Sequence, residues 1–149
     1  MLFRSSSFPG ITFRLEFSST SCKGDLILVT SMDTDNFFKI VLDNEVKTTF
    51  HYKLGDGDFS VSALVPAKKS FCDGQRHIVR FERYGKTIKY GVDDGQEVQT
   101  NESGIAIATF SKPDKIVLGG ISSNKFDGCV YSASVLFHWK KYQIGRAHV

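Results

Sequence analysis

Apolar and polar side chains alternate along most of the chain in short segments. In residues 77–83, for example, Val79 and Phe81 face one way while Arg80 and Glu82 face the other. A period of two residues is typical of a β-strand with one buried face. Similar segments recur at residues 12–17, 26–30, 37–42, 45–52, 59–64, 87–92, 96–100, 105–109, 115–118 and 130–137. The pattern therefore predicts a chain built almost entirely of short strands.

Turn residues separate these segments. Asp43-Asn44 predicts a two-residue hairpin turn, because Asn and Asp tolerate the left-handed backbone that such a turn requires. No segment combines helical periodicity with capping residues, so we expect almost no α-helix. Short strands joined by local turns predict an all-β fold, with two antiparallel sheets packed as a jelly-roll sandwich.

Composition is consistent with that fold and excludes some functions. At 149 residues the chain fits a single domain, and thirteen Phe against two Met and one Trp favour strands. The net charge of +3 is too small to indicate nucleic-acid binding, and no basic segment is dense enough to do so. No apolar run reaches the length that crosses a bilayer. We therefore expect neither nucleic acid nor membrane insertion.

The two ends of the chain stand apart from the alternating pattern. Residues 1–10 are Ser-rich and lack an apolar stretch of signal-peptide length, so they are a leader of unclear status. Residues 143–149 resemble the conceptual translation of a sequencing-library adapter, although an ordinary charged tail is the alternative. We expect the domain to cover residues 11–142 and to be clipped at both ends.

Several motifs in a fixed order carry a resemblance to a known family. They are FRLEF at 13–17, GDLIL at 24–28, CDGQRHIVRF at 72–81, VDDG at 92–95, IVLGG at 116–120 and FDGCV at 126–130. In this order they resemble laminin G-like domains of the laminin α chain type, to which neurexin, agrin and perlecan modules are related. Arg76 departs from the family, which has an aromatic residue there. The resemblance implies a sandwich of the laminin G and concanavalin A-like type.

The resemblance also implies a function. It predicts a secreted recognition module of the extracellular matrix or of cell adhesion, which binds acidic or sulfated glycans, cell-surface receptors or matrix proteins and catalyses no reaction. A carbohydrate-active enzyme and a small-ligand carrier on a similar sandwich are the alternatives. A retaining glycosidase needs two carboxylates about 5 Å apart. Glutamates here occur singly on separate segments, which favours the binding module.

Many members of the family bind one Ca²⁺ at a rim of the sandwich. The resemblance assigns the ligands to the Asp58 carboxylate, the backbone carbonyls of Ile78 and Thr109, and the Ser111 side chain, with Asp56 able to supplement Asp58. Calcium prefers carboxylate and carbonyl oxygens, so the uncharged hydroxyl of Ser111 predicts a weak site. The alternative for Asp56 and Asp58 is turn chemistry in a Gly-rich loop.

The three cysteines are an odd count for a secreted domain. The family implies that Cys129 bonds to a cysteine outside this chain. Cys22 and Cys72 are a possible pair, with reduced or buried thiols as the alternative, because sequence alone does not bring their Cα atoms within disulfide reach.

The resemblance implies a second candidate site, a basic surface that binds sulfated or acidic glycans. The candidates are Arg80, Arg83, Lys89, Lys112 and Lys115. Arg80 and Lys89 are expected to face outward on neighbouring strands, where a polyanion could contact both. Scattered, solvated side chains are the alternative. Asn101-Glu102-Ser103 is an N-glycosylation sequon in a polar segment, as suits a secreted domain.

Overall fold

The fold consists of short strands, and a computed structural model describes residues 10–31, 35–54, 57–101, 113–120, 125–137, 140–145 and 147–148. The strands are β1 (Gly10–Ser19), β2 (Gly24–Ser31), β3 (Phe37–Leu42), β4 (Lys47–Leu54), β5 (Gly57–Leu64), β6 (His77–Tyr84), β7 (Thr87–Val92), β8 (Val98–Asn101), β9 (Pro113–Leu118), β10 (Gly128–Phe137), β11 (Lys140–Ile144) and β12 (Ala147–His148). None of the described residues forms a helix, and the part of the chain that is described holds no segment able to cross a bilayer as one.

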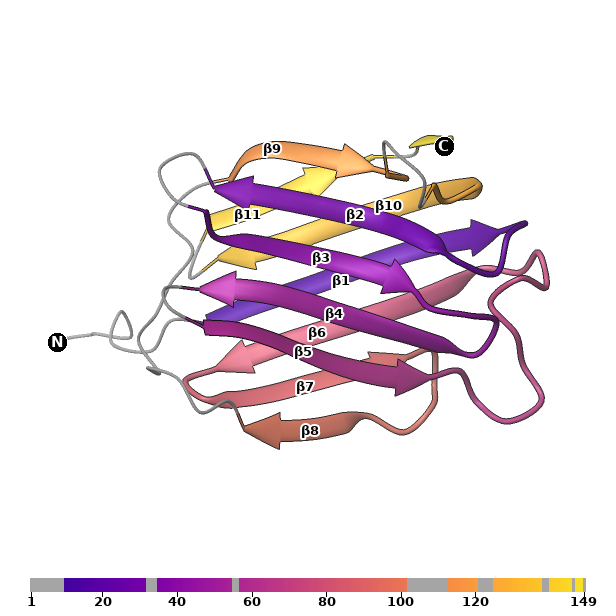
Figure 1. The fold of residues 1–149 in the computed structure, drawn as a ribbon, viewed down its shortest axis with the longest axis horizontal. Helices are drawn as coiled ribbons and strands as arrows, with labels where there is room; N and C mark the ends of the chain where they lie inside the picture. Colours follow the sequence, from indigo (N-terminus) through magenta and orange to yellow (C-terminus); the bar gives the residue numbers. More distant parts are fainter. Residues whose placement is uncertain are drawn as a thin grey trace, which may run out of the picture.

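The strands form two antiparallel sheets that pack face to face (Figure 1). Sheet A has the order β11-β10-β1-β6-β7-β8, with β12 also pairing with β10. Sheet B has the order β5-β4-β3-β2-β9 and lies in front in Figure 1. The all-β, two-sheet sandwich predicted from the alternating pattern is confirmed.

An aromatic core joins the two sheets. The Phe50 ring of β4 stacks on the Phe81 ring of β6, with centroids 3.8 Å apart and planes 6° from parallel. Phe13 and Tyr90 of sheet A meet Phe50 edge-on, at centroid distances of 5.7 Å each. All four residues are at most 1% exposed. The abundance of Phe in the sequence is therefore explained by core packing between the sheets.

Most predicted strands agree with the structure, with one local error. Asp43-Asn44 is not a two-residue turn, because β4 begins only at Lys47. The Asn44 side-chain oxygen accepts the N–H groups of Val46 and Lys47 at 2.9 and 3.0 Å. That side-chain capping stabilises a longer loop over residues 43–46. The predicted strand at residues 105–109 lies outside the described residues.

The expected boundary after residue 142 can be compared with the backbone pairing. In β11, Gln143 pairs with Ser134 and Ile144 with Ala133. In β12, Ala147 pairs with Val130. The backbone pairing of sheet A thus continues beyond residue 142, whereas the origin of residues 143–149 stays a prediction.

Candidate ligand-binding face

The outer face of sheet A carries an unusual pairing of like charges. Arg14 of β1 lies directly opposite Arg80 of β6 in the register. The other residues opposite these arginines are Ser134 for Arg14 and Gly91 for Arg80, so no carboxylate faces either one across the strands. Directly opposed side chains have Cβ atoms about 5 Å apart, and like charges at that spacing destabilise a sheet.

Lys89 of β7 extends this charge along the sheet. It lies opposite Glu82 of β6, and Glu82 is in turn two residues from Arg80 on the same outer side. Arg14 is exposed, and Arg80 and Lys89 are half-buried. We call Arg14, Arg80 and Lys89 together the basic face.

Neighbouring backbone fixes the position of Arg80. Its guanidinium donates a hydrogen bond to the backbone carbonyl of Asp93, at the turn after β7. A Cβ added to Gly91 would lie 3.2 Å from Nη2 of Arg80, which is tighter than most real contacts. Glycine at this position therefore lets the Arg80 side chain lie across β7.

Beside the basic face, His77 is held between two carboxylates. Its Nδ1 lies 2.8 Å from Oδ2 of Asp93 and its Nε2 lies 2.9 Å from Oδ1 of Asp73, while the side chain is 2% exposed. An ionised carboxylate only accepts hydrogen bonds, so both ring nitrogens donate when His77 is protonated. Burial alone lowers the pKa of His77, but the hydrogen bonds and charges of Asp93 and Asp73 outweigh it and raise that pKa above 6.5.

The turn that carries Asp93 is tied to β6 by its backbone as well. Oδ1 of Asp93 accepts the N–H of Ile78 at 2.8 Å, and the N–H of Asp93 donates to the Ile78 carbonyl at 2.8 Å. Asp93 has a φ of 52°, in the left-handed region that Asp tolerates. These contacts fix the turn after β7 to the start of β6, and His77 links that turn to Asp73 in the loop before β6.

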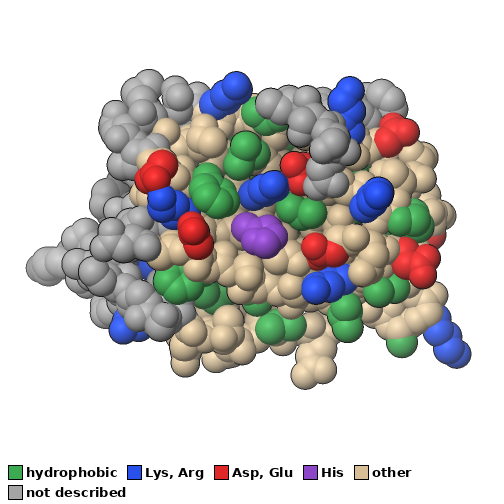
Figure 2. All heavy atoms as spheres, viewed as in Figure 1, with side chains coloured by type: hydrophobic (Ala, Val, Ile, Leu, Met, Phe, Trp, Pro, Cys, Tyr) green, Lys and Arg blue, Asp and Glu red, His purple; other side chains and the backbone are tan. Residues whose placement is uncertain are grey.

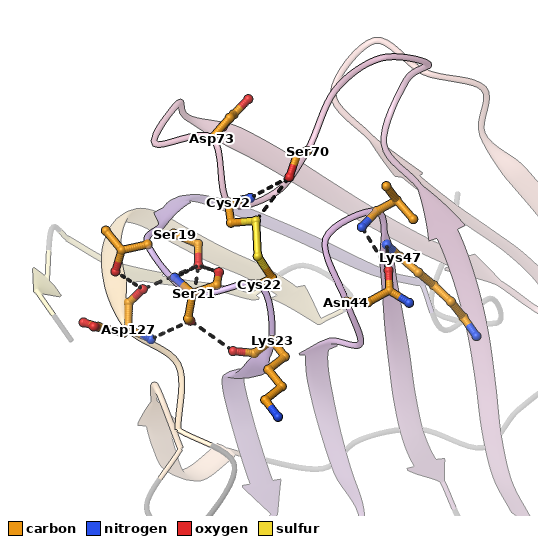
Figure 3. The surroundings of a disulfide bond; sticks show 12 residues. Ser19, Ser21, Cys22, Lys23, Asn44, Lys47, Ser70, Cys72, Asp73 and Asp127 are labelled. Carbon is orange, nitrogen blue, oxygen red and sulfur yellow. Dashed lines mark hydrogen bonds between the residues drawn. A yellow bond between two sulfur atoms is a disulfide. The ribbon is translucent and has the colours of Figure 1, made fainter.

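A disulfide fixes the same end of the sandwich (Figure 3). Cys22, between β1 and β2, bonds to Cys72, so the possible pair predicted from sequence is confirmed by the structure. The Cys72 N–H also donates to the Ser70 hydroxyl at 3.2 Å. The Glu45 side chain lies within 4.8 Å of both sulfurs, but sulfurs bonded to each other are not the thiolates that a metal ion requires. Cys129 is half-buried and forms no disulfide with another of the described residues, and its expected partner outside the chain stays a prediction.

Arg76, which stands where the resemblance implies an aromatic residue, contacts an aromatic ring. Its guanidinium carbon lies 3.9 Å from the ring centroid of Tyr131 on β10, and its Nη1 lies 3.5 Å from Oε2 of Glu16. A cation over the face of a tyrosine ring is attracted by the ring's negative face. Arg76 therefore packs on an aromatic ring of β10 and lies within ion-pair distance of Glu16 on β1.

Several predicted glycan-binding residues do not share this face. Arg83 is 0% exposed, so its prediction as a surface ligand is wrong. It lies opposite Ile11 and Ile88, which are also buried, and so points into the sandwich. Lys115 is exposed on β9 of sheet B, away from Arg80 and Lys89. Lys112 lies outside the described residues.

The structure also separates two of the proposed calcium ligands. Lys53 follows Phe50 by three residues in β4, and Asp58 lies opposite Lys53. Ile78 precedes Phe81 by three residues in β6. Strands β4 and β6 run in the same direction in Figure 1, so Asp58 and Ile78 lie at opposite ends of the sandwich. At about 3.3 Å per residue from the Phe50–Phe81 stack, they are on the order of 20 Å apart. They cannot bind the same ion, so this ligand set is wrong.

The remaining proposed calcium ligands, Asp56, Thr109 and Ser111, lie outside the described residues. Sequence reasoning also missed two features of the site. Arg14 was overlooked although it alternates with Phe13 and Leu15 and so had to face outward. The clamp of His77 by Asp73 and Asp93 had no local signal, because its members come from a loop, a strand and a turn.

The outer face of sheet B differs in character. Figure 2 shows basic, acidic and apolar side chains interspersed over this face. Lys39 pairs with Asp25, with Nζ and Oδ2 3.6 Å apart, and Lys53 contacts Asp35. Lys39 and Lys53 on this face thus each have a neighbouring carboxylate.

Comparison with known proteins agrees with the architecture. The family model described as "Laminin G domain" matches residues 17–136. The "Basement membrane proteoglycan" of Caenorhabditis elegans is 32% identical over 91 residues, which is 54% of this chain and 2% of that protein. The structure of mouse laminin alpha1 chain domains LG4-5 matches with a TM-score of 0.72 and 22% identity, over 92% of this chain and 38% of that one.

A bacterial domain shares the fold at lower similarity. The CBM40 domain of the Ruminococcus gnavus IT-sialidase, bound to α2,3-sialyllactose, matches with a TM-score of 0.57 and 15% identity, over 95% of this chain and 75% of that one. This likeness concerns the fold alone. The family model covers most of the residues of the sandwich. The chain belongs to the laminin G domain family.

Proposed function

We propose that this domain is an extracellular matrix recognition module that binds acidic glycans on its basic face. The observation that carries the proposal is the direct opposition of Arg14 and Arg80 on the outside of sheet A. Two directly opposed cations destabilise the sheet when no anion is bound to it. An acidic glycan crossing β6 could contact Arg14 on β1 with one acidic group and the Arg80 guanidinium over β7 with the next, which would offset the repulsion.

Basic residues beside the clamp support the same proposal. An open pocket at this end is lined by Lys68, Lys69 and Arg76 together with the clamp residues. Asp73 and Asp93, which also line the pocket, contact His77 with their carboxylates, and Asp94 is a third acidic residue of the lining. A linear polyanion crossing the basic face could therefore continue toward these three cations.

The similar proteins support a matrix setting. One matched protein is a basement membrane proteoglycan, and another is a laminin chain. The bacterial module of similar fold is bound to sialyllactose, an acidic glycan. The recognition of whole matrix proteins or receptors belongs to the same proposal, with the basic face as its glycan-binding part.

Affinity chromatography on immobilised heparin tests the proposal. The double variant Arg14→Gln/Lys89→Gln removes two charges from the basic face and leaves the bonded Arg80 in place. Each exposed contact to a sulfate contributes about 0.5–1 kcal/mol, so we expect binding to weaken by roughly five- to thirtyfold. The protein should then elute at lower salt, since screening weakens such contacts.

The double variant Lys39→Gln/Lys53→Gln is the matched control. It removes the same net charge from the outer face of sheet B, where both lysines have carboxylate partners. We expect it to elute with the unmodified protein. Equal losses in the two double variants would mean that net charge alone governs retention, and the basic face would not be the binding site.

Calcium assistance of glycan binding stays a prediction. Asp58 lies at the far end of the sandwich from Ile78, so the proposed ligand set does not support it. The same column, run with millimolar calcium and then with a chelator, tests it directly. Identical elution in both runs would show that calcium does not assist this binding.

A further inference from the structure

Asn101, the acceptor residue of the sequon, lies at the border of the basic face. It is the last residue of β8, which is an edge strand of sheet A, and it is exposed. Its Oδ1 accepts a hydrogen bond from the Thr87 hydroxyl at 3.3 Å. The amide nitrogen is the atom to which an oligosaccharide is attached, and the exposed position leaves room for one.

The register fixes the distance from Asn101 to the basic face. Asn101 lies opposite Thr87, and Gln99 lies opposite Lys89. Alternation puts Thr87 and Lys89 on the same side of β7, so Asn101 and Lys89 are diagonal neighbours on one surface. Diagonal neighbours of this kind are about 7–8 Å apart, which is less than the length of a branched N-linked glycan.

We propose that Asn101 carries an N-linked glycan that covers the Lys89 side of the basic face and weakens its binding of acidic glycans. This inference rests on the function proposed above. The attached oligosaccharide is held at the site by a covalent bond, so its local concentration stays high at any protein concentration. It obstructs an incoming polyanion at Lys89 and leaves Arg14, two strands further away, accessible.

Variants at Ser103 test the inference and leave both residues of the hydrogen bond between Thr87 and Asn101 unchanged. Ser103→Ala destroys the sequon, whereas Ser103→Thr keeps it. The full chain, expressed in a glycosylating eukaryotic host, is analysed by intact mass for occupancy and on immobilised heparin for binding. Loss of about one exposed contact predicts that Ser103→Ala binds two- to fivefold more tightly than the unmodified protein, and that Ser103→Thr does not differ from it.

Enzymatic trimming gives a second measurement on an unchanged sequence. An endoglycosidase that leaves only the first sugar on Asn101 should raise the affinity for heparin to that of Ser103→Ala. An unoccupied Asn101, or an occupied one with equal retention before and after trimming, overturns the inference. A failure of the proposed function looks different, because then neither the glycosylated nor the sugar-free form is retained at low salt.

Discussion

The outer faces of the two sheets have the same alternating construction but opposite charge arrangements. On sheet B, Lys39 has Asp25 as a partner and Lys53 has Asp35. On sheet A, Arg14 faces Arg80, and the guanidinium of Arg80 is held by a backbone carbonyl. The two lysines on sheet B have carboxylate partners within the protein, whereas Arg14 and Arg80 on sheet A face each other, which is the arrangement on which the proposed glycan binding rests.

The two charge arrangements have different effects on the free energy of unfolding. Exposed ion pairs contribute little to folding, so sheet B gains only modestly from its matched charges. Opposed arginines carry a small cost instead. A cost confined to one face is what a binding surface on a stable sandwich would show, because the shared core compensates for it.

The largest expected effect comes from truncating a side chain of the core on which both sheets pack. Phe50→Ala deletes a ring that is 0% exposed and stacked on Phe81. Truncation of a buried phenylalanine costs about 3–5 kcal/mol. Urea denaturation should show that loss in the free energy of unfolding, while the exposed control Ser60→Ala should change it by less than about 0.5 kcal/mol. A loss for Phe50→Ala as small as that of the control would show that the stack does not hold the sheets together.

The second effect concerns the end of sheet A that carries the clamp. The Cys22–Cys72 bond closes a loop of sequence separation 50. Cross-links of this kind stabilise by about 2–4 kcal/mol, chiefly by restricting the unfolded chain. We expect Cys22→Ser/Cys72→Ser to lower the free energy of unfolding by that amount in urea, with the Ser70→Ala variant as a control that keeps the disulfide. An unchanged midpoint would mean that the hydrogen bonds of this end suffice without the cross-link.

Features of the two faces that depend on one strand could be predicted from the sequence, whereas features that depend on the pairing of distant strands could not. Alternation within β6 was sufficient to place Arg80 outward. The same alternation put Arg83 on the side of Phe81, so its burial was predictable and was overlooked. The opposition of Arg14 and Arg80 was not predictable, because the register joins strands that are far apart in the sequence. The calcium ligands failed for a related reason, since local motifs do not determine which end of the sandwich each loop occupies.

The third prediction compares one histidine from each sheet, because their pKa values shift in opposite directions. The pKa of His77 is raised, so its contribution to stability is present below pH 6.5 and is lost as the pH rises through the folded-state value. Burial and the charge of Lys39 lower the pKa of His51 on sheet B, so its contribution is present above pH 6.5 and is lost as the pH falls.

Thermal unfolding at a series of pH values separates these contributions. Loss of one hydrogen bond to a charged partner costs about 1.5–3 kcal/mol, so the unmodified protein should lose stability above pH 6.5. His77→Gln should remove that loss, whereas His51→Gln should leave it in place and reduce the loss below pH 6.5. Identical pH profiles for His77→Gln and the unmodified protein would show that the clamp does not depend on a protonated His77.

The smallest expected effect distinguishes the two faces by sign. Lys39→Ala breaks the 3.6 Å pair with Asp25 and should lower the free energy of unfolding by about 0.2–1 kcal/mol. Arg14→Gln relieves the repulsion from Arg80 and should raise it by a similar amount, while weakening retention on heparin. Paired urea titrations of the two variants at low salt measure both changes, and high salt should reduce both because the charges are exposed. A stability loss in Arg14→Gln would show that Arg14 has a structural role, and the contrast between a matched face and a binding face would no longer hold.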